Sequence, residues 1–241
     1  MRHLLVTSAS AALAVATASP AFAAPGLGNE VDGATAEKGE FEAESRYDTL
    51  TGGPDDGEDV IQLEGMYGVS DRLRLGVNLE IEREPGFPRK AEDLGLEAIW
   101  TVGRVGGIDV AIYGEYGITF DGTDAVETKL ILQRRTGPWD LRFNLIAEKE
   151  LDSSEPVELG YAASVDAEVA DELRIGVQAF GELGTTRDFL PRSEHFFGPV
   201  IKYEVEGLGP ELKLEAGYLF ALSKAKDDTN GQLRIGLELE F

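Results

Sequence analysis

Few residues of this chain could carry covalent chemistry. The 241 residues include no cysteine, which excludes disulfides, thiol catalysis and cysteine-ligated zinc. Of the two histidines, His3 lies in a segment that we expect to be removed, which leaves His195 as the imidazole of the mature chain. Ser193 stands two positions earlier, so His195 could remove its proton, with Asp188 or Glu194 orienting the ring. The simpler interpretation makes His195 a hydrogen-bonding residue near a loop.

The charge balance excludes another class of function. Lysine and arginine total 22 against 45 acidic residues, so the net charge of -23 repels phosphate backbones and we predict no nucleic-acid partner. The chain has no Walker loop, no Gly-x-Gly-x-x-Gly that opens a helix and no His-Glu-x-x-His, and we predict neither a cofactor nor a bound metal. Acidic loop residues could collect Mg²⁺ or Ca²⁺, but they lack calcium-loop spacing and are interpreted as solvated charges. They are Asp55, Asp56, Glu58, Asp59, Asp227 and Asp228.

The first 23 residues have the composition of an export signal. Arg2 gives a positive start, residues 4–18 are apolar or small, and Ala21-Phe22-Ala23 offers the small-x-small site that signal peptidase cuts. The apolar part is too short for a membrane-spanning helix, which needs about 20 residues. We therefore expect a signal peptide at residues 1–23, cleaved after Ala23, and an exported mature chain.

The rest of the chain alternates between apolar and polar positions. Residues 73–82 read Leu-Arg-Leu-Gly-Val-Asn-Leu-Glu-Ile-Glu, and the same period of two runs through Leu233, Ile235, Leu237, Leu239 and Phe241. A period of two indicates a strand with one apolar face. Twelve such segments are predicted at 37–47, 59–68, 72–83, 92–102, 108–120, 125–135, 139–149, 157–169, 172–184, 195–205, 211–222 and 231–241. Pro199 lacks an N–H, which predicts a bulge or a late strand start within 195–205.

The connections indicate how the segments are arranged. Long polar connections, such as residues 51–57, alternate with short ones that carry tight-turn residues, such as Gly106-Gly107. An even number of strands of about ten residues, with both ends on the short-turn side, is the pattern of a transmembrane antiparallel up-and-down β-barrel. The predicted organisation is all-β: a short N-terminal arm at residues 24–36, then a single barrel domain of about 12 strands at residues 37–241.

Strand parity predicts which side chains face outward. Aromatic residues fall on the apolar outer face in two groups, as expected where lipid meets water. One group, near the short turns, is Phe41, Tyr67, Trp100, Trp139, Tyr203 and Phe241, and the other, near the long loops, is Tyr47, Phe120, Tyr218 and Phe220. The alternative is a soluble sandwich in which these aromatic residues form the core.

The signal, the amphipathic strands and the final Leu233-x-Ile235-x-Leu237-x-Leu239-x-Phe241 resemble bacterial outer-membrane β-barrel proteins. The resemblance implies an outer-membrane location, contact with lipid and lipopolysaccharide, and recognition of Leu237, Leu239 and Phe241 by the barrel-assembly machinery. Residues 67–76, Tyr-Gly-Val-Ser-Asp-Arg-Leu-Arg-Leu-Gly, look more narrowly like the outer-membrane transporters grouped as MetA-pathway phenol-degradation proteins. That resemblance implies a channel for small solutes, aromatic ones among them.

The inward face suggests what such a barrel does. Acidic side chains outnumber basic ones there by about two to one, which predicts a negatively charged lumen and a passive channel for small solutes that favours cations. The predicted lumen-lining residues are Glu80, Glu97, Glu115, Glu148, Asp166 and Glu182, with Arg74, Arg142 and Arg174 as counter-charges. The same charges could instead pair across strands and close the barrel, which would make it a structural protein with no pore.

A hydrolase is the remaining alternative. Outer-membrane phospholipases and lipid A deacylases resemble this chain in size and place a serine and a histidine on the outer surface near one rim. Ser193 and His195 share the outward face by parity, but their order is the reverse of the family motif, and Glu194 points away from both. We therefore expect no enzymatic activity. In the loops, Arg187, Arg192, Lys224 and Lys226 are the expected contacts for lipopolysaccharide phosphates.

Overall fold

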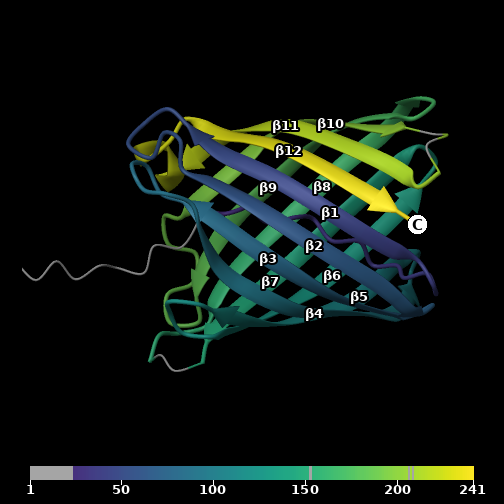
Figure 1. Cartoon of the computed structure of the whole chain (residues 1–241), viewed down its shortest axis with the longest axis horizontal. Helices are drawn as coiled ribbons and strands as arrows, with labels where there is room; N and C mark the ends of the chain where they lie inside the picture. The colour runs from purple at the N-terminus through teal and green to yellow at the C-terminus, as the bar shows by residue number, and fades with distance from the viewer. Residues whose placement is uncertain (1–23, 152–153, 206, 208) are drawn as a thin grey trace, which may run out of the picture.

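The computed structural model describes residues 24–151, 154–205, 207 and 209–241, and the predicted signal peptide lies outside them. The described residues form twelve strands and one short 3₁₀ helix (Figure 1). The strands are β1 (Phe41–Thr51), β2 (Asp59–Ser70), β3 (Leu73–Arg83), β4 (Lys90–Val105), β5 (Ile108–Thr119), β6 (Ala125–Thr136), β7 (Trp139–Glu150), β8 (Glu158–Ala170), β9 (Leu173–Thr185), β10 (Glu194–Val205), β11 (Glu211–Ser223) and β12 (Gly231–Glu240), and the helix is η1 (Lys224–Asp227). Within the described part of the chain, no helix is long and apolar enough to cross a membrane.

The strands form one closed antiparallel barrel. Each strand pairs with its neighbours in sequence, and β1 pairs with β12 from Glu42↔Glu240 to Thr51↔Gly231. Closure satisfies the ladder groups of the first and last strands, which would otherwise form two free edges. The predicted fold class, an up-and-down barrel of about twelve strands, is therefore confirmed.

The first strand lies four residues later than the pattern predicted. The expected segment was 37–47, and β1 covers Phe41–Thr51. Gly39 has a φ of 92°, and its N–H donates to Gly68 O at 2.8 Å, so the chain turns before it enters the sheet. Alternation alone could not locate this turn, because Glu40 and Glu42 continue the polar side of the same period. The other eleven strands end within three residues of the predicted limits.

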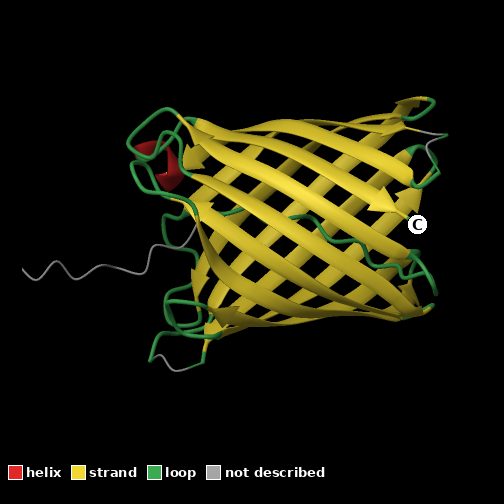
Figure 2. Cartoon of the chain, viewed as in Figure 1, coloured by secondary structure: helices red, strands yellow, loops and turns green. Residues whose placement is uncertain are grey.

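The connections sort onto opposite ends of the barrel. Two-residue turns join strands at 71–72, 106–107, 137–138 and 171–172, and residues 206–210 make the remaining connection at that end. The loops at the other end are longer, as at 52–58, 186–193 and 224–230. We call these the short-turn end, where the C-terminus lies beside the start of β1 (Figure 1), and the long-loop end, where the helix η1 lies (Figure 2).

Pro199 interrupts the sheet differently from the prediction. Gly198 and Pro199 pair with β9, but their pairs with β11 are missing between Phe197↔Phe220 and Val200↔Gly217. The register is the same on both sides of the gap, so there is no bulge, and β10 already begins at Glu194. The missing N–H is thus accommodated by a local loss of pairing.

The outer face is apolar, as parity predicts. Phe41, Tyr67, Trp100, Trp139, Tyr203 and Phe241 are all exposed near the short-turn end, and Phe120 and Phe220 are exposed near the other end. Two clusters of buried apolar residues lie inside the barrel. Tryptophan exposure of 55% at Trp100 and 49% at Trp139 excludes the soluble sandwich in which these rings form the core.

Both tryptophans should therefore contact lipid near the headgroups. In liposomes, lipids brominated close to the headgroup should quench their fluorescence more strongly than lipids brominated near the chain ends. Single Trp100→Phe and Trp139→Phe variants assign the signal to each ring. Quenching that is absent for both tryptophans, or strongest at the bilayer centre, would contradict the predicted girdle.

Candidate functional site: the lumen and its N-terminal arm

The arm (residues 24–36) runs through the lumen. Figure 2 shows this segment as a loop inside the barrel wall, before the chain turns into β1. Ala24 lines a cavity at the long-loop end together with Leu50, whereas Thr35 and Ala36 line a cavity at the short-turn end. The arm thus passes along the barrel axis from one end to the other.

Three apolar side chains of the arm are buried in the lumen. Leu27 and Val31 are 1% and 6% exposed and join an apolar cluster with residues from β1, β2 and β8–β11. Ala34, with no exposed surface, joins a second cluster with Met66, Ile99 and others. Spaced three or four residues apart, these side chains place an apolar core inside the barrel.

Polar side chains of the wall bind the arm backbone. Asn144 on β7 pairs with both backbone groups of Asp32: its Oδ1 accepts from Asp32 N at 2.7 Å and its Nδ2 donates to Asp32 O at 3.2 Å. The backbone of Ala34 donates to Gln133 Oε1 at 3.0 Å and accepts from Thr101 Oγ1 at 2.9 Å. These contacts pair buried backbone N–H and C=O groups of the arm, as a neighbouring strand would pair them in a sheet.

An ion cluster surrounds the half of the arm that lies nearer the long-loop end. Asp48 accepts a hydrogen bond from Gly28 N at 2.9 Å and lies 3.3 Å from Arg234 Nη2. Arg234 donates to Gly26 O at 2.7 Å, and Arg46 donates to Gly28 O at 2.8 Å. All three wall side chains are at most 5% exposed, so each buried charge depends on its partners.

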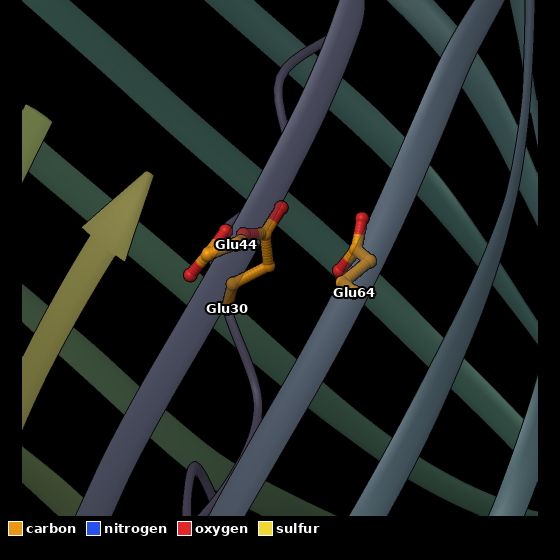
Figure 3. Close-up of side chains that lie close together, drawn as sticks. All are labelled: Glu30, Glu44 and Glu64. Atoms are coloured by element: carbon orange, nitrogen blue, oxygen red, sulfur yellow. The ribbon is translucent and has the colours of Figure 1, made fainter. Parts of the chain in front are cut away.

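Carboxylates gather around Arg46 where the arm enters the half of the lumen nearer the short-turn end. Glu30 of the arm and Glu44 and Glu64 of the wall bring oxygens within 4.8 Å of one another (Figure 3), and Glu44 forms a second such group with Glu42 and Glu238. The guanidinium of Arg46 pairs with Glu30 at 2.7 Å and with Glu44. Arg46 therefore supplies positive charge where the first group could otherwise hold a cation, and we assign no metal site.

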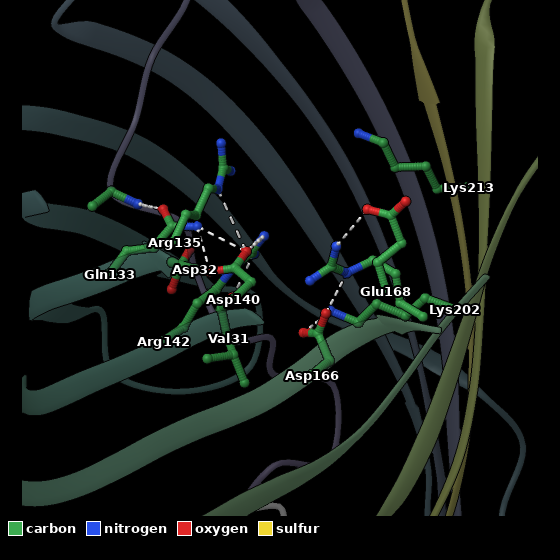
Figure 4. A network of polar contacts seen from close by, with 12 residues as sticks. Val31, Asp32, Gln133, Arg135, Asp140, Arg142, Asp166, Glu168, Lys202 and Lys213 are labelled. Carbon is green, nitrogen blue, oxygen red and sulfur yellow. Dashed lines mark hydrogen bonds and ion pairs between the residues drawn. The ribbon is translucent and has the colours of Figure 1, made fainter. Parts of the chain in front are cut away.

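At the short-turn end, a hydrogen bond ties the arm to the wall, and ion pairs connect side chains of the wall. Arg142 donates to Val31 O at 3.2 Å and pairs with Asp140, which also accepts from Gln133 (Figure 4). Asp166 pairs with Arg174 and lies 3.6 Å from Lys202. Neighbouring strands are thus bridged across the lumen surface.

Two cavities inside the barrel border opposite ends of the arm. The inner cavity, at the short-turn end, has a volume of about 1120 Å³, and the described residues that line it include 15 carboxylates against eight arginines and lysines. The outer cavity, at the long-loop end, is about 330 Å³. Its lining includes Asp55, Glu58, Glu82, Glu84, Glu194 and Asp228, with Arg83 as the basic residue.

The predicted lumen residues all lie on the inward face but not around one opening. Arg74, Arg142, Asp166 and Arg174 line the inner cavity. Glu97 and Glu115 instead bind Asn78 Nδ2 at 2.8 and 2.9 Å on the wall of β3–β5. Glu80, Glu148 and Glu182 line neither of the two cavities described above.

The serine and histidine of the hydrolase alternative are not brought together. Ser193 precedes β10, is 3% exposed and donates to Pro191 O at 3.1 Å. The Nδ1 atom of His195 lies 3.3 Å from Tyr161 OH, on the outer face. The prediction that Ser193 shares this face with His195 is wrong, because strand parity does not extend into the preceding loop.

The loop cations lie at the long-loop end, and the C-terminal residue Phe241 lies at the short-turn end. Arg192 pairs with Asp227 at 2.9 Å and Lys224 pairs with Glu194 at 2.9 Å, so both already have acidic partners. The hydrogen bond from Arg192 holds the pKa of the Asp227 carboxyl below its usual value. At the opposite end the Phe241 ring lies 6.0 Å from the Phe41 ring, between centroids, on the outside of the barrel.

Sequence reasoning missed the residues that hold the arm. Asp48, Asn144 and Gln133 were not singled out, because a polar residue facing inward looks the same whether it meets water or a backbone. The available signal was in the arm itself: Leu27 and Val31 stand in a segment rich in glycine and alanine that has no strand period. Apolar residues without a strand to place them indicate that a loop is buried.

Comparison with known proteins bears on the fold. No protein-family model matches the sequence and no curated protein matches it closely. Solved structures do match. The NanC porin has a TM-score of 0.58 at 11% identity, with 83% of this chain and 98% of NanC covered. The COG4313 outer membrane channel from Pseudomonas putida F1 has a TM-score of 0.57 at 14% identity, with 88% and 99% covered.

The chain has the fold of an outer-membrane porin. The KdgM porin adds a third match, with a TM-score of 0.51 at 11% identity over 83% of this chain and 99% of KdgM. These matched structures are porins and channels. At 11–14% identity, these structures show a shared fold.

Replacing Asn144 should loosen the arm. Asn144→Ala leaves the buried N–H and C=O of Asp32 without their partners, which should lower the free energy of unfolding by about 2 kcal/mol. Hydrogen exchange at the Asp32 amide should become faster. The matched control is Asn78→Ala, which removes an amide bound to the wall and should leave exchange in the arm unchanged. Equal protection of Asp32 in both variants would contradict the assignment.

Glu58 should make stability depend on pH. Burial, with the neighbouring carboxylates of Asp55, Glu82 and Glu84, raises the pKa of Glu58 to about 7. The folded protein favours the neutral form of Glu58. The contribution of this group to the free energy of unfolding therefore falls as pH rises from its pKa in the unfolded chain toward its pKa in the folded protein. Glu58→Gln should raise the free energy of unfolding at pH 8 by about 1 kcal/mol and leave it unchanged at pH 4, as measured with urea. A gain of equal size at both values would exclude ionisation as the cause.

Proposed function

We propose that this protein is a passive outer-membrane channel for small solutes. The observation that carries the proposal is the pair of cavities, about 1120 and 330 Å³, at opposite ends of one closed barrel. Between them the lumen is occupied by a segment that no strand pairing holds, because the arm binds the wall through side chains. A barrier built this way can move without breaking the barrel.

The lumen charge favours cations over anions. The inner cavity has nearly twice as many carboxylates as basic groups among its described lining residues, and low-dielectric walls strengthen their field. KdgM has also been solved in complex with oligogalacturonate, a polyanion. The excess of carboxylates here disfavours such a ligand, so we propose small cationic or neutral solutes.

The cellular setting completes the proposal. An export signal at residues 1–23 delivers the chain, and Phe241, Leu239 and Leu237 present an outward apolar row for the barrel-assembly machinery. The exposed girdles contact lipid. Arg187, whose Nη2 donates to Ser154 O at 3.0 Å, and Lys226 are exposed at the long-loop end, where they can approach lipopolysaccharide phosphates. No enzymatic step is part of this function.

A closed structural barrel is the second candidate. The observation that favours it is the number of polar contacts between wall and arm, which include both backbone groups of Asp32, Ala34 and Gly28. In this alternative the arm is a permanent part of the core, and the two cavities never connect.

Channel recordings separate the two candidates. In planar bilayers, deletion of residues 24–36 should raise single-channel conductance about threefold or more, because the deletion removes the barrier between the cavities. A potassium chloride gradient should give a reversal potential that shows cation preference in the deletion variant.

The outcomes differ clearly. Absence of conductance steps in both the full chain and the deletion variant would support the structural barrel and reject the channel. Anion preference that survives replacement of Arg74, Arg142 and Arg174 by glutamine would reject the proposed role of lumen charge. Retained electrophoretic mobility of the folded barrel without boiling is the control for assembly.

A further inference from the structure

The outer end of the arm folds into two consecutive tight turns. Leu27 N donates to Ala24 O at 2.8 Å, and Asn29 N donates to Gly26 O at 3.2 Å. The second inner residues of these turns are Gly26 and Gly28, with φ of 86° and 81°, as type II geometry requires. We call residues 24–29 the double turn. It makes the arm thicker at this level than an extended chain would be.

The double turn lies between the two cavities. Ala24 lines the outer cavity, and the inner cavity begins at Glu30, whereas residues 25–29 line neither of them. Leu27, at 1% exposure, is the arm side chain that this segment contributes to the apolar cluster, where Leu50, Phe180 and Leu219 are at most 2% exposed. Gly26, Leu27 and Gly28 are three consecutive buried residues, and they lie between the two cavities.

The two glycines let the backbone touch the wall. A Cβ atom at Gly26 would lie 2.5 Å from Phe180 Cγ, and one at Gly28 would lie 2.9 Å from Val60 Cγ1. Neither position has room for a side chain, and both need a positive φ. Gly26 and Gly28 thus bring the backbone against the wall on either side of Leu27.

The ion cluster binds the backbone of both glycines. Arg234 donates to Gly26 O, while Arg46 and Asp48 bind the carbonyl and amide of Gly28. Arg234 also lies over the Phe180 ring, 4.5 Å from its centroid. Polar clamping of the glycines and apolar packing of Leu27 therefore meet at one level of the barrel.

From these contacts we infer that Gly26-Leu27-Gly28 is the part of the arm that blocks the lumen, and we call these three residues the seat. Leu27 is a positioning residue: its side chain, in the apolar cluster, keeps the double turn across the lumen and separates the inner cavity from the outer one. The rest of the arm does not close the inner cavity, since Glu30, Val31, Gly33, Thr35 and Ala36 line it. This inference rests on the proposed channel function.

A polar substitution at the seat tests the inference. In Leu27→Asn, the open level seen after deletion of residues 24–36 should appear for at least about ten times the fraction of recording time found in the unmodified chain. Leu27→Met, which keeps an apolar side chain of similar volume, should behave as the unmodified chain. The matched control is Thr35→Asn, an exposed arm position at the inner cavity, which should cause no change.

Thiol protection gives a second measurement that does not depend on conductance. Because the chain has no cysteine, Leu27→Cys and Thr35→Cys each introduce a single thiol. In the folded barrel, a charged methanethiosulfonate reagent should modify Cys at 35 at least about a hundredfold faster than Cys at 27, which is reached only when the seat opens. Similar rates at both positions would overturn the inference even if Leu27→Asn failed to assemble.

The outcomes also separate this inference from the proposed function. If the arm deletion conducts but Leu27→Asn does not differ from Leu27→Met, the seat lies elsewhere and the channel stands. If neither the deletion nor Leu27→Asn conducts while Cys at 27 is protected, the double turn is seated in a closed barrel and the channel function fails.

Discussion

The pairing of β1 with β12 is the constraint on which the rest of the structure depends. Backbone groups that face hydrocarbon have no water to bind, so the sheet must close on itself. Closure at twelve strands encloses a lumen wider than wall side chains alone fill. The ten register pairs between these strands thus determine both the smooth outer face and the need for something inside.

The arm meets that need, and it does so as a core element. In a soluble domain the interior is filled by side chains from opposing layers, whereas here Leu27, Val31 and Ala34 enter from a strand-free segment. Buried wall charges such as Asp48 and Arg234 would be costly without partners, and arm carbonyls and amides provide several of them. The arm therefore fills the lumen and also provides partners for the charged side chains buried there.

This arrangement makes a barrier out of weak, separable contacts. A strand of the wall cannot leave without exposing a free edge, but the arm can leave at the cost of side-chain hydrogen bonds and one apolar cluster. Solved porins and channels share the architecture of this chain at 11–14% identity and no more. Ligand preference therefore depends on the lining charges of each chain.

The sequence by itself determined the barrel, because strand parity is a local property: the side chain at each second position faces the same way, so alternation around Leu73 or Leu233 already separates outside from inside. For the same reason it placed the exposed aromatic residues on the outer face and located eleven strands to within three residues. Only the tertiary structure decided what the inward residues meet. Asn144 binds an arm 112 residues away, Glu97 binds a neighbouring strand, and Arg174 borders a cavity, although all three looked equivalent in the pattern. A period of two specifies whether a side chain points into or out of the barrel. What an inward side chain contacts depends on the closure of the barrel and on the path of the arm, and the arm has no periodic pattern in its sequence.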